Sequence, residues 1–325
     1  MTNSLQKETS SLTKWVFTNN FQFYNFIKPV NKPSYTNNFW NGFRPTASSG
    51  NTRPSRPNKL EQQIIQSSFF TGKLNRPISR SNKYAVLIGI NYNGSLHKLN
   101  GCINDMYNLN RFFKTKGYLP KNIELISDEK TKLPTKARIL SSLEKMLKKA
   151  KKGDNCVFTY SGHGTQTINS DGTEKDGKDE CFLSCLMEKI TDNEIKDVIQ
   201  RNLKPGVKLF CLLDCCHSGT ILDLRYNYKY TIAKSEYYEN EKEVQTKGDV
   251  VMISGCMDKQ VSMDAYLEGK YQGAMTNSFL KCISRSKNWD VLINNMRDTL
   301  SRESFDQIPQ LSAGRKINLN NKISF

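Results

Sequence analysis

Two short polar motifs follow apolar runs, and their residue types could do chemistry. The run NCVFTY leads into YSGHG at 160–164, and VKLFCLLD leads into DCCHSG at 214–219. Adjacent cysteines between a carboxylate and a histidine are compatible with a metal site, a redox pair or a nucleophile. Histidine is scarce, and the chain holds three: His97, His163 and His217.

The alternation of side chains along a strand sorts these residues by direction. If extended geometry persists to the end of each strand, Asp214 and Cys216 share one face while Cys215 faces the opposite side. His217, next to Cys216, then points elsewhere and is a poor base. A thiolate–imidazole pair needs its two members to face each other. The pattern therefore predicts a cleft lined by Asp214, Cys216, Ser161 and His163. The alternatives are that His163 is an exposed loop residue and that the cysteines pack in the core.

The elements that must position these residues alternate from Lys83 onward. Apolar runs at 84–90, 122–127, 155–160, 207–214 and 249–255 are typical of strands buried on both faces. Between and after them lie amphipathic segments at 103–118, 134–153, 191–203, 277–287 and from 289, with capping-box chemistry at Thr191 and Glu194. The order predicts an α/β fold, a mainly parallel sheet with helices on both faces. In such folds chemistry gathers where strands end.

The first 82 residues have a different composition. Residues 1–83 hold twelve Lys or Arg against two acids, Glu8 and Glu61, out of a net charge of +17 for the whole chain. Asn, Ser, Thr and Pro dominate, and periodicity is absent apart from a short helix at 58–69, so we expect a disordered basic leader. A transit sequence and binding to nucleic acid or to a membrane surface are the alternatives, and nucleic acid is the less favoured partner.

The cysteine count and the hydropathy place further bounds on the protein. Nine cysteines is an odd number, and none precedes Cys102, which does not suit a disulfide scaffold. No apolar run reaches about 18 residues, and no secretory signal is apparent. These features predict a cytoplasmic protein without a membrane span.

The two motifs, about fifty residues apart, resemble the His and Cys motifs of the metacaspases, the caspase-like cysteine peptidases. Other segments match in order over roughly 83–320: YAVLIGINY, LNGCINDM, DGTEKDGKDE, LDL, ISGCMDKQVSMDA, GAMTNSF and IPQLS. The resemblance, of the type I arrangement, implies a leader at 1–82, which is a possible prodomain, and a peptidase domain at 83–325. That domain comprises a large-subunit-like part (83–225), a linker (226–248) and a small-subunit-like part (249–325).

The resemblance also implies roles for individual residues. Cys216 would be the nucleophile and His163 the general acid and base, as a dyad without a third orienting residue. The backbone N–H groups of Cys216 and Gly164 would hold the oxyanion. The family's acidic primary pocket matches Asp105 and Asp214, with Ser161 and Cys102 nearby. Protein or peptide substrates with Arg or Lys at P1, the residue before the scissile bond, are therefore expected.

Calcium is the cofactor that the resemblance implies, and no organic cofactor is expected. The matching ligand positions are Asp179, Asp192, Asn193 and Asp223. Asn193 replaces an aspartate of the family pattern, which removes one charge from the site. The linker is polar and without periodicity, so we expect an unstructured connector, and it carries Lys229, Lys234, Lys242 and Lys247 as candidates for self-cleavage. We expect a monomer. A catalytically weak caspase-like scaffold that acts through partner binding is the alternative function.

Overall fold

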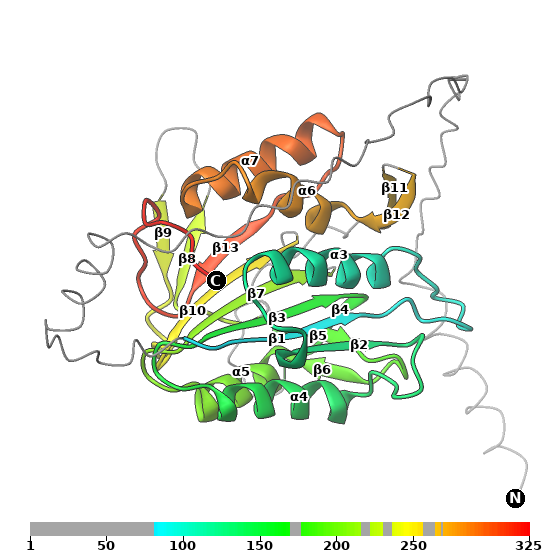
Figure 1. Cartoon of the computed structure of the whole chain (residues 1–325), viewed down its shortest axis with the longest axis horizontal. Coiled ribbons are helices and arrows are strands. Elements are labelled where there is room, and N and C mark those ends of the chain that lie inside the picture. The colour runs from blue at the N-terminus through cyan, green and yellow to red at the C-terminus, as the bar shows by residue number, and fades with distance from the viewer. Residues whose placement is uncertain (1–80, 170–176, 216–221, 230–235, 256–263, 268) are drawn as a thin grey trace, which may run out of the picture. The chain divides into compact units, whose positions relative to one another are not determined.

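A computed structural model describes residues 81–325, except 170–176, 216–221, 230–235, 256–263 and 268 (Figure 1). Four parts of the sequence-based interpretation lie outside these residues: the leader with its expected helix, Cys216, His217 and Lys234.

The centre of the fold is an eight-stranded sheet in the order β2-β1-β3-β7-β10-β13-β8-β9. Its parallel part comprises β2 (Ile123–Ser127), β1 (Lys83–Gly89), β3 (Asn155–Ser161), β7 (Lys208–Asp214) and β10 (Asp249–Ser254). The antiparallel part comprises β13 (Gln310–Ala313), β8 (Tyr226–Lys229) and β9 (Glu236–Glu239). The five strands predicted from apolar runs are the five parallel strands, and their bounds agree within one residue.

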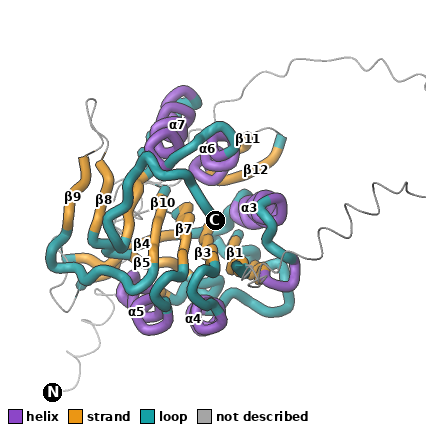
Figure 2. The backbone as a smooth tube through the Cα atoms, turned by 60° about the vertical axis from the view of Figure 1, so that its left-hand side comes forward, coloured by secondary structure: helices purple, strands orange, loops and turns teal. Residues whose placement is uncertain are grey.

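Helices cover both faces of this sheet, as the alternation predicts (Figure 2). One face carries α3 (Cys102–Thr115), α6 (Ala274–Ile283) and α7 (Trp289–Arg302), and the other carries α4 (Lys136–Lys149) and α5 (Asp192–Asn202). Thr191 and Glu194 form the predicted capping box of α5. The predicted α/β fold, a mainly parallel sheet with helices on both faces, is therefore confirmed. None of the described helices has both the length and the hydropathy needed to cross a bilayer.

The helix predicted at 277–287 begins three residues earlier and ends at Ile283. Its first turn has no local side-chain cap. Instead, the Asp214 carboxylate at the end of β7 accepts a hydrogen bond from the Thr276 N–H at 2.9 Å. Because this partner lies 62 residues away in sequence, local capping signals could not locate the start of the helix.

Smaller pieces complete the fold. A three-stranded sheet comprises β4 (Gly164–Ile168), β5 (Lys178–Leu183) and β6 (Lys189–Thr191). β11 (Asp264–Leu267) and β12 (Lys270–Gly273) form a hairpin ahead of α6, and a single 3₁₀ turn, η1, spans Pro120–Asn122.

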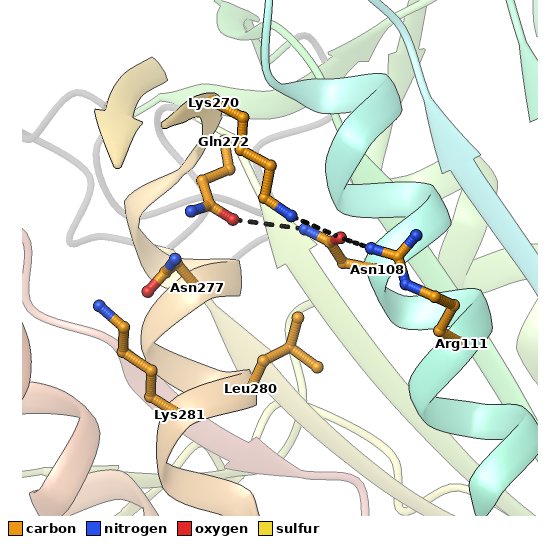
Figure 3. Close-up of a pocket in the computed structure, with 7 residues that line it drawn as sticks. All are labelled: Asn108, Arg111, Lys270, Gln272, Asn277, Leu280 and Lys281. Carbon is orange, nitrogen blue, oxygen red and sulfur yellow. Dashed lines mark hydrogen bonds between the residues drawn. The ribbon is translucent and has the colours of Figure 1, made fainter. Parts of the chain in front are cut away.

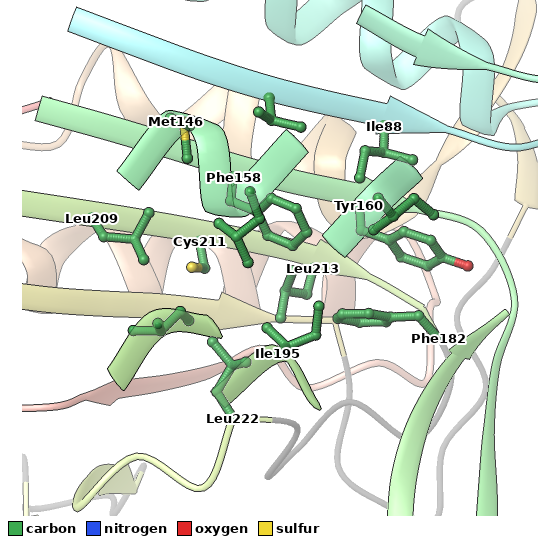
Figure 4. Close-up of a cluster of buried hydrophobic side chains, with 14 of the residues drawn as sticks. Ile88, Met146, Phe158, Tyr160, Phe182, Ile195, Leu209, Cys211, Leu213 and Leu222 are labelled. Carbon is green, nitrogen blue, oxygen red and sulfur yellow. The ribbon is translucent and has the colours of Figure 1, made fainter. Parts of the chain in front are cut away.

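Strand alternation divides the core into two layers. Toward α4 and α5, the layer includes Phe158, Tyr160, Leu209, Cys211 and Leu213 (Figure 4). The intervening residues Val157, Phe210 and Leu212 pack toward α3, α6 and α7. The alternation used in the sequence analysis therefore holds along β3 and β7 up to their ends.

The linker at 226–248 is more structured than its sequence indicates. It contains β8 and β9, which extend the sheet beyond β13, with Tyr226 opposite Ala313 and Tyr228 opposite Leu311. Both tyrosines are buried. The expectation of an unstructured connector is therefore wrong for these two strands. Four-residue strands that pair with a distant edge carry too little periodic signal to be recognised locally.

Truncation of a core ring tests the layer between the sheet and α6. Phe279 is fully buried and stacks on Phe210 at 5.8 Å between ring centroids. Phe279→Ala should lower the free energy of unfolding by about 3–5 kcal/mol, because it leaves a cavity in a packed core. Urea denaturation measures this loss. The matched control is Leu96→Ala, since Leu96 is fully exposed, and an equal loss in both variants would contradict the layer assignment.

Candidate active site

Two neighbouring strands bring the polar motifs to one edge of the sheet. β3 and β7 pair in parallel, and the register places Ser161 opposite Asp214. Both side chains are buried, whereas Cys215 packs on the other face among Leu213 and its neighbours. The division between Asp214 and Cys215 is therefore the one that alternation predicts. Cys216 lies outside the described residues, so its role stays a prediction.

Two carboxylates converge at this edge, from segments far apart in sequence. Asp105, in the first turn of α3, accepts a hydrogen bond from Ser161 Oγ at 2.8 Å and from the Gly273 N–H at 2.9 Å. Asp214 accepts hydrogen bonds from the Thr276 N–H at 2.9 Å and from Thr276 Oγ1 at 2.8 Å. These donors orient the two carboxylates. The result is a buried acidic pair at the edge of the sheet.

Gly273, the residue before α6, lies against both carboxylates. A methyl group on this residue would lie 2.3 Å from Asp214 Oδ2 and 2.7 Å from Asp105 Oδ2. Both distances are far below van der Waals contact, so a side chain here would displace the carboxylates. The glycine of GAMTNSF thus lets the backbone approach both carboxylates closely. Gly273 and Thr276 contact the acidic pair, and neither residue was among the predicted site residues.

Cys102, also predicted near this pocket, is the first residue of α3 and is buried. Its thiol lies close enough to the hydroxyls of Tyr92 and Tyr160 to raise their pKa values further, beyond the larger effect of burial. Cys102 therefore lies in the same part of the core as the two tyrosines.

A pocket of about 310 Å³ lies between α3 and α6, and its charged lining residues are cationic (Figure 3). It is lined by Asn108, Arg111, Lys270, Gln272, Asn277, Leu280 and Lys281. Lys281 pairs with Glu303 at 2.9 Å, while Lys270 and Arg111 both donate to Asn108 Oδ1.

The imidazole of His163 is oriented by a backbone carbonyl. Its Nε2 lies 2.7 Å from the carbonyl oxygen of His97. A carbonyl can only accept, so Nε2 carries a proton, and in the neutral ring Nδ1 is the basic nitrogen. The Tyr92 ring lies against the imidazole at 4.5 Å between centroids. The resemblance implied a dyad without a third group. The sequence could not reveal this orienting group, because every residue has a backbone carbonyl and no residue type marks the one that contacts His163.

The remaining predicted residues are dispersed around the site. Gly164 begins β4 opposite Phe182, directly after His163, and its role toward the oxyanion stays a prediction. In the linker, Lys229 ends β8 within the sheet, whereas Lys242 and Lys247 are exposed between β9 and β10.

Three of the four predicted calcium ligands influence one another electrostatically. Asp192 is 1% exposed at the start of α5. Burial, and then the negative charge of Asp223 and of Asp179, raise its pKa to about 7. The fourth residue, Asn193, donates a hydrogen bond to Asp179 Oδ1 at 3.5 Å. Carboxylate and amide oxygens are hard ligands of the kind that Ca²⁺ prefers.

A lysine occupies part of this acidic region. Lys196 Nζ lies 3.6 Å from Asp223 Oδ2 and 2.5 Å from Glu243 Oε2, with all three side chains largely shielded from solvent. The described residues contain no group of three or more His, Cys, Asp or Glu side chains that could hold a metal ion. The donor chemistry therefore suits calcium, but in this arrangement Asp223 faces an ammonium group.

The raised pKa of Asp192 predicts a pH dependence of stability. The folded protein holds this proton up to about pH 7, whereas the ordinary pKa is 3.8, so stability from this group is lost as pH rises between these values. In metal-free buffer, the free energy of unfolding of Asp192→Asn relative to wild type should rise by roughly 2–3 kcal/mol from pH 5 to pH 8.

Urea denaturation with EGTA at both pH values measures this difference. Asp197→Asn is the control, since Asp197 lies on the exposed face of the same helix and pairs only with Arg201 among the ion pairs described there. A pH-independent difference between Asp192→Asn and wild type would contradict the assignment.

Known proteins show the same organisation. The family model described as metacaspase, peptidase C14 domain, matches residues 83–225. Metacaspase-1 of Yarrowia lipolytica is 36% identical over 74% of this chain and 63% of its own length. Metacaspase-1 of Candida glabrata is 32% identical over 84% of this chain and 81% of its own length.

A solved structure, protein GSU0716 from Geobacter sulfurreducens, matches with a TM-score of 0.56 at 22% identity. The match covers 74% of this chain and 97% of that one. At this identity the match supports the fold alone, while the sequence matches to curated relatives extend over most of the chain. The chain therefore belongs to the metacaspase family.

Proposed function

We propose that the protein is a cysteine endopeptidase that cleaves peptide bonds after Arg or Lys, with Cys216 as nucleophile and His163 as general acid and base. Family membership supports the peptidase class. The observation that carries the specificity is the convergence of Asp105 and Asp214 on Gly273, at the strand edge that also bears His163.

The acidic pocket favours a cationic P1 side chain for an electrostatic reason. Two buried carboxylates repel each other, and a guanidinium or ammonium placed between them relieves that repulsion. A guanidinium can also donate several hydrogen bonds to carboxylate oxygens in fixed geometry. An aspartate at P1 would add a third negative charge to the same space, so the pocket selects against it.

The tautomer of His163 defines the proton path in this proposal. With Nε2–H directed at the His97 carbonyl, Nδ1 takes the proton of the Cys216 thiol. The thiolate attacks the scissile carbonyl carbon, and the oxyanion is held by the N–H groups of Cys216 and Gly164. His163 then protonates the leaving amine as the C–N bond breaks. Water hydrolyses the resulting thioester with His163 as base.

A panel of fluorogenic peptides ending in Arg, Lys or Asp tests the specificity. Arg and Lys peptides should be hydrolysed and the Asp peptide should not. Asp105→Asn should lower kcat/KM for the Arg peptide by about 30-fold or more, since it removes one charge of a buried pair. Gly273→Ala should have a comparable effect, because its methyl group enters the pocket.

Asp154→Asn provides a matched control for the loss of a buried carboxylate. Asp154 precedes β3 at the opposite end of the sheet and accepts hydrogen bonds from the N–H groups of Asn82 and Lys151. This variant should lose stability while keeping the P1 preference. Turnover of the Asp peptide would refute the pocket assignment, and no turnover of any peptide would favour the scaffold alternative.

We also propose that calcium stimulates the enzyme and that it processes itself in the linker. The mutual repulsion of Asp179, Asp192 and Asp223 supports a cation site, because a divalent ion would neutralise it. The exposure of Lys242 and Lys247 between two strands supports cleavage there, since exposed loops are the preferred sites of proteolysis. Lys229 is held within the sheet and is the weaker candidate.

Incubation of wild type and Cys216→Ala with calcium or with EGTA tests self-processing. Fragments should appear only in wild type with calcium, and Lys242→Gln/Lys247→Gln should remove the fragments that end at these residues. Electrophoresis and mass spectrometry identify the cleavage sites. Intact wild type in calcium would rule self-processing out.

Calcium binding itself is measured in Cys216→Ala, where cleavage does not interfere. Calcium should raise its Tm, since a ligand that binds the folded state alone stabilises it. Asp192→Asn in the same background should reduce this shift. An unchanged Tm at millimolar calcium would remove calcium from the proposal.

A further inference from the structure

Two tyrosine hydroxyls meet beneath the backbone of His163. Tyr92 and Tyr160 are each 1% exposed, and their hydroxyl oxygens are 2.9 Å apart. Burial raises the pKa of both phenols well above the ordinary value of 10. Both hydroxyls therefore stay protonated at any working pH and act as neutral hydrogen-bonding groups.

The two hydroxyls satisfy backbone groups of His163 and of Leu183, the last residue of β5. Tyr92 Oη accepts from the His163 N–H at 2.9 Å and donates to the Leu183 carbonyl at 2.9 Å. Tyr160 Oη donates to the His163 carbonyl at 2.8 Å and accepts from the Leu183 N–H at 3.2 Å. Tyr160 Oη also lies 2.8 Å from the Leu183 carbonyl. Each hydroxyl has one proton, so with Tyr92 donating to Leu183 and Tyr160 donating to His163, both protons are used and both backbone polar groups of His163 are held.

The hydroxyls of Tyr92 and Tyr160 also lie against Gly162 of the YSGHG motif. A methyl group on this residue would lie 2.7 Å from Tyr160 Oη and 2.9 Å from Tyr92 Oη. Contacts this short are not tolerated by atoms that are themselves held by hydrogen bonds. The absence of a side chain at Gly162 therefore lets the backbone before His163 lie directly against the two hydroxyls.

Tyr92 adopts a strained backbone to reach this position. Its φ is 53°, in the left-handed region that bulky residues rarely occupy. The Asp128 carboxylate holds the backbone on both sides, since it accepts from the Asn91 N–H at 2.9 Å and from the Asn93 N–H at 2.8 Å. Such strain persists only where surrounding contacts determine it, and it concentrates at functional sites.

The loop that carries Tyr92 contacts His163 in three ways. The Tyr92 hydroxyl holds the backbone N–H, its ring packs on the imidazole, and the carbonyl of His97, five residues later, accepts from Nε2. The position of the ring and the position of the main chain are thus set by one short loop. A displacement of this loop moves both together.

We propose that Tyr92 and Tyr160 are positioning residues for His163. Their hydroxyl pair fixes the position of the histidine backbone and thereby the position of its imidazole. The proposal rests on the proposed function for the chemistry of His163, but the placement of the ring is a property of the fold. Misplacement of a catalytic group by a fraction of an ångström lowers the rate of the chemical step more than substrate binding.

Tyr92→Phe and Tyr160→Phe test the proposal, since each keeps the ring and removes the hydroxyl. Tyr92→Phe should lower kcat for an Arg peptide by about tenfold with KM changed less than about twofold. Tyr160→Phe should have the smaller effect, because the His163 carbonyl still accepts a hydrogen bond from the Leu183 N–H at 3.1 Å. The double variant should lose less than the product of the single losses, since the two hydroxyls share one network.

Tyr118→Phe is the matched control. Tyr118 is equally buried, but its hydroxyl has no hydrogen-bond partner among the described residues. Removal of this hydroxyl should leave kcat and KM unchanged, and it should not reduce stability. An equal loss of kcat in Tyr118→Phe and Tyr92→Phe would contradict the proposal, because it would show that the loss of any buried hydroxyl in the core lowers kcat.

NMR titration of the histidine rings provides a readout that does not need peptide cleavage. The chain has three histidines, so the His163 signal is assigned by comparison with His163→Ala. Tyr92→Phe should shift the ring signals of His163, because the displaced ring loses the His97 carbonyl that accepts from Nε2. Wild-type kcat and an unchanged His163 titration in Tyr92→Phe would overturn the proposal.

This readout also separates the two proposals. If wild type cleaves no Arg or Lys peptide, the proposed specificity fails, while the titration still decides whether the hydroxyls position His163. If Tyr92→Phe does not fold, Tyr160→Phe carries the same test.

Discussion

The parallel pairing of β3 with β7 is the constraint on which the site depends. Its register places Ser161 opposite Asp214 and ends both strands at the same edge of the sheet. The strand residues that precede each motif are mostly apolar and are buried on both faces, so the pairing is fixed by the hydrophobic cores above and below. A slip of one residue would exchange Asp214 with Cys215 and bury the carboxylate in the apolar layer. The chemistry at the edge is therefore a consequence of core packing along the whole length of the strands.

Charge is separated on a short length scale around this edge. Asp105 and Asp214 form a buried acidic pair, and a pocket with cationic side chains lies between α3 and α6. The same elements contribute to both, since Asn108 follows Asp105 on α3 and Gln272 precedes Gly273 on β12. Hydrogen bonds from Ser161, Gly273 and Thr276 hold the carboxylates in place. Selectivity at such a site arises as much from repulsion of the wrong charge as from attraction of the right one.

Some features of the site follow from residue type and period. Alternation along β7 predicts that Asp214 and Cys215 face opposite sides, and the structure shows this division. Resemblance between motifs predicts the acidic pair, which comes from α3 and β7. Periodicity does not predict elements that are short or whose first turn is capped by a residue distant in sequence. The strands β8 and β9 pair with the edge of the sheet, and α6 begins at a carboxylate 62 residues away. Neither relation leaves a local pattern in the sequence.

The sequence by itself determined the alternating order of strands and helices, the two motifs at strand ends, and the family. These depend on the order of residue types, which periodicity and motif comparison detect directly. Only the tertiary structure decided what surrounds His163: the His97 carbonyl, the strained Tyr92 and the two hydroxyls against Gly162. His97 acts through a backbone atom, and both His97 and Tyr92 lie about 70 residues from His163 in sequence. Such contacts exist only after the loop following β1 has packed against the loop following β3. The glycines are present in the sequence from the outset, but the reason for them lies in the folded neighbours that a side chain would meet.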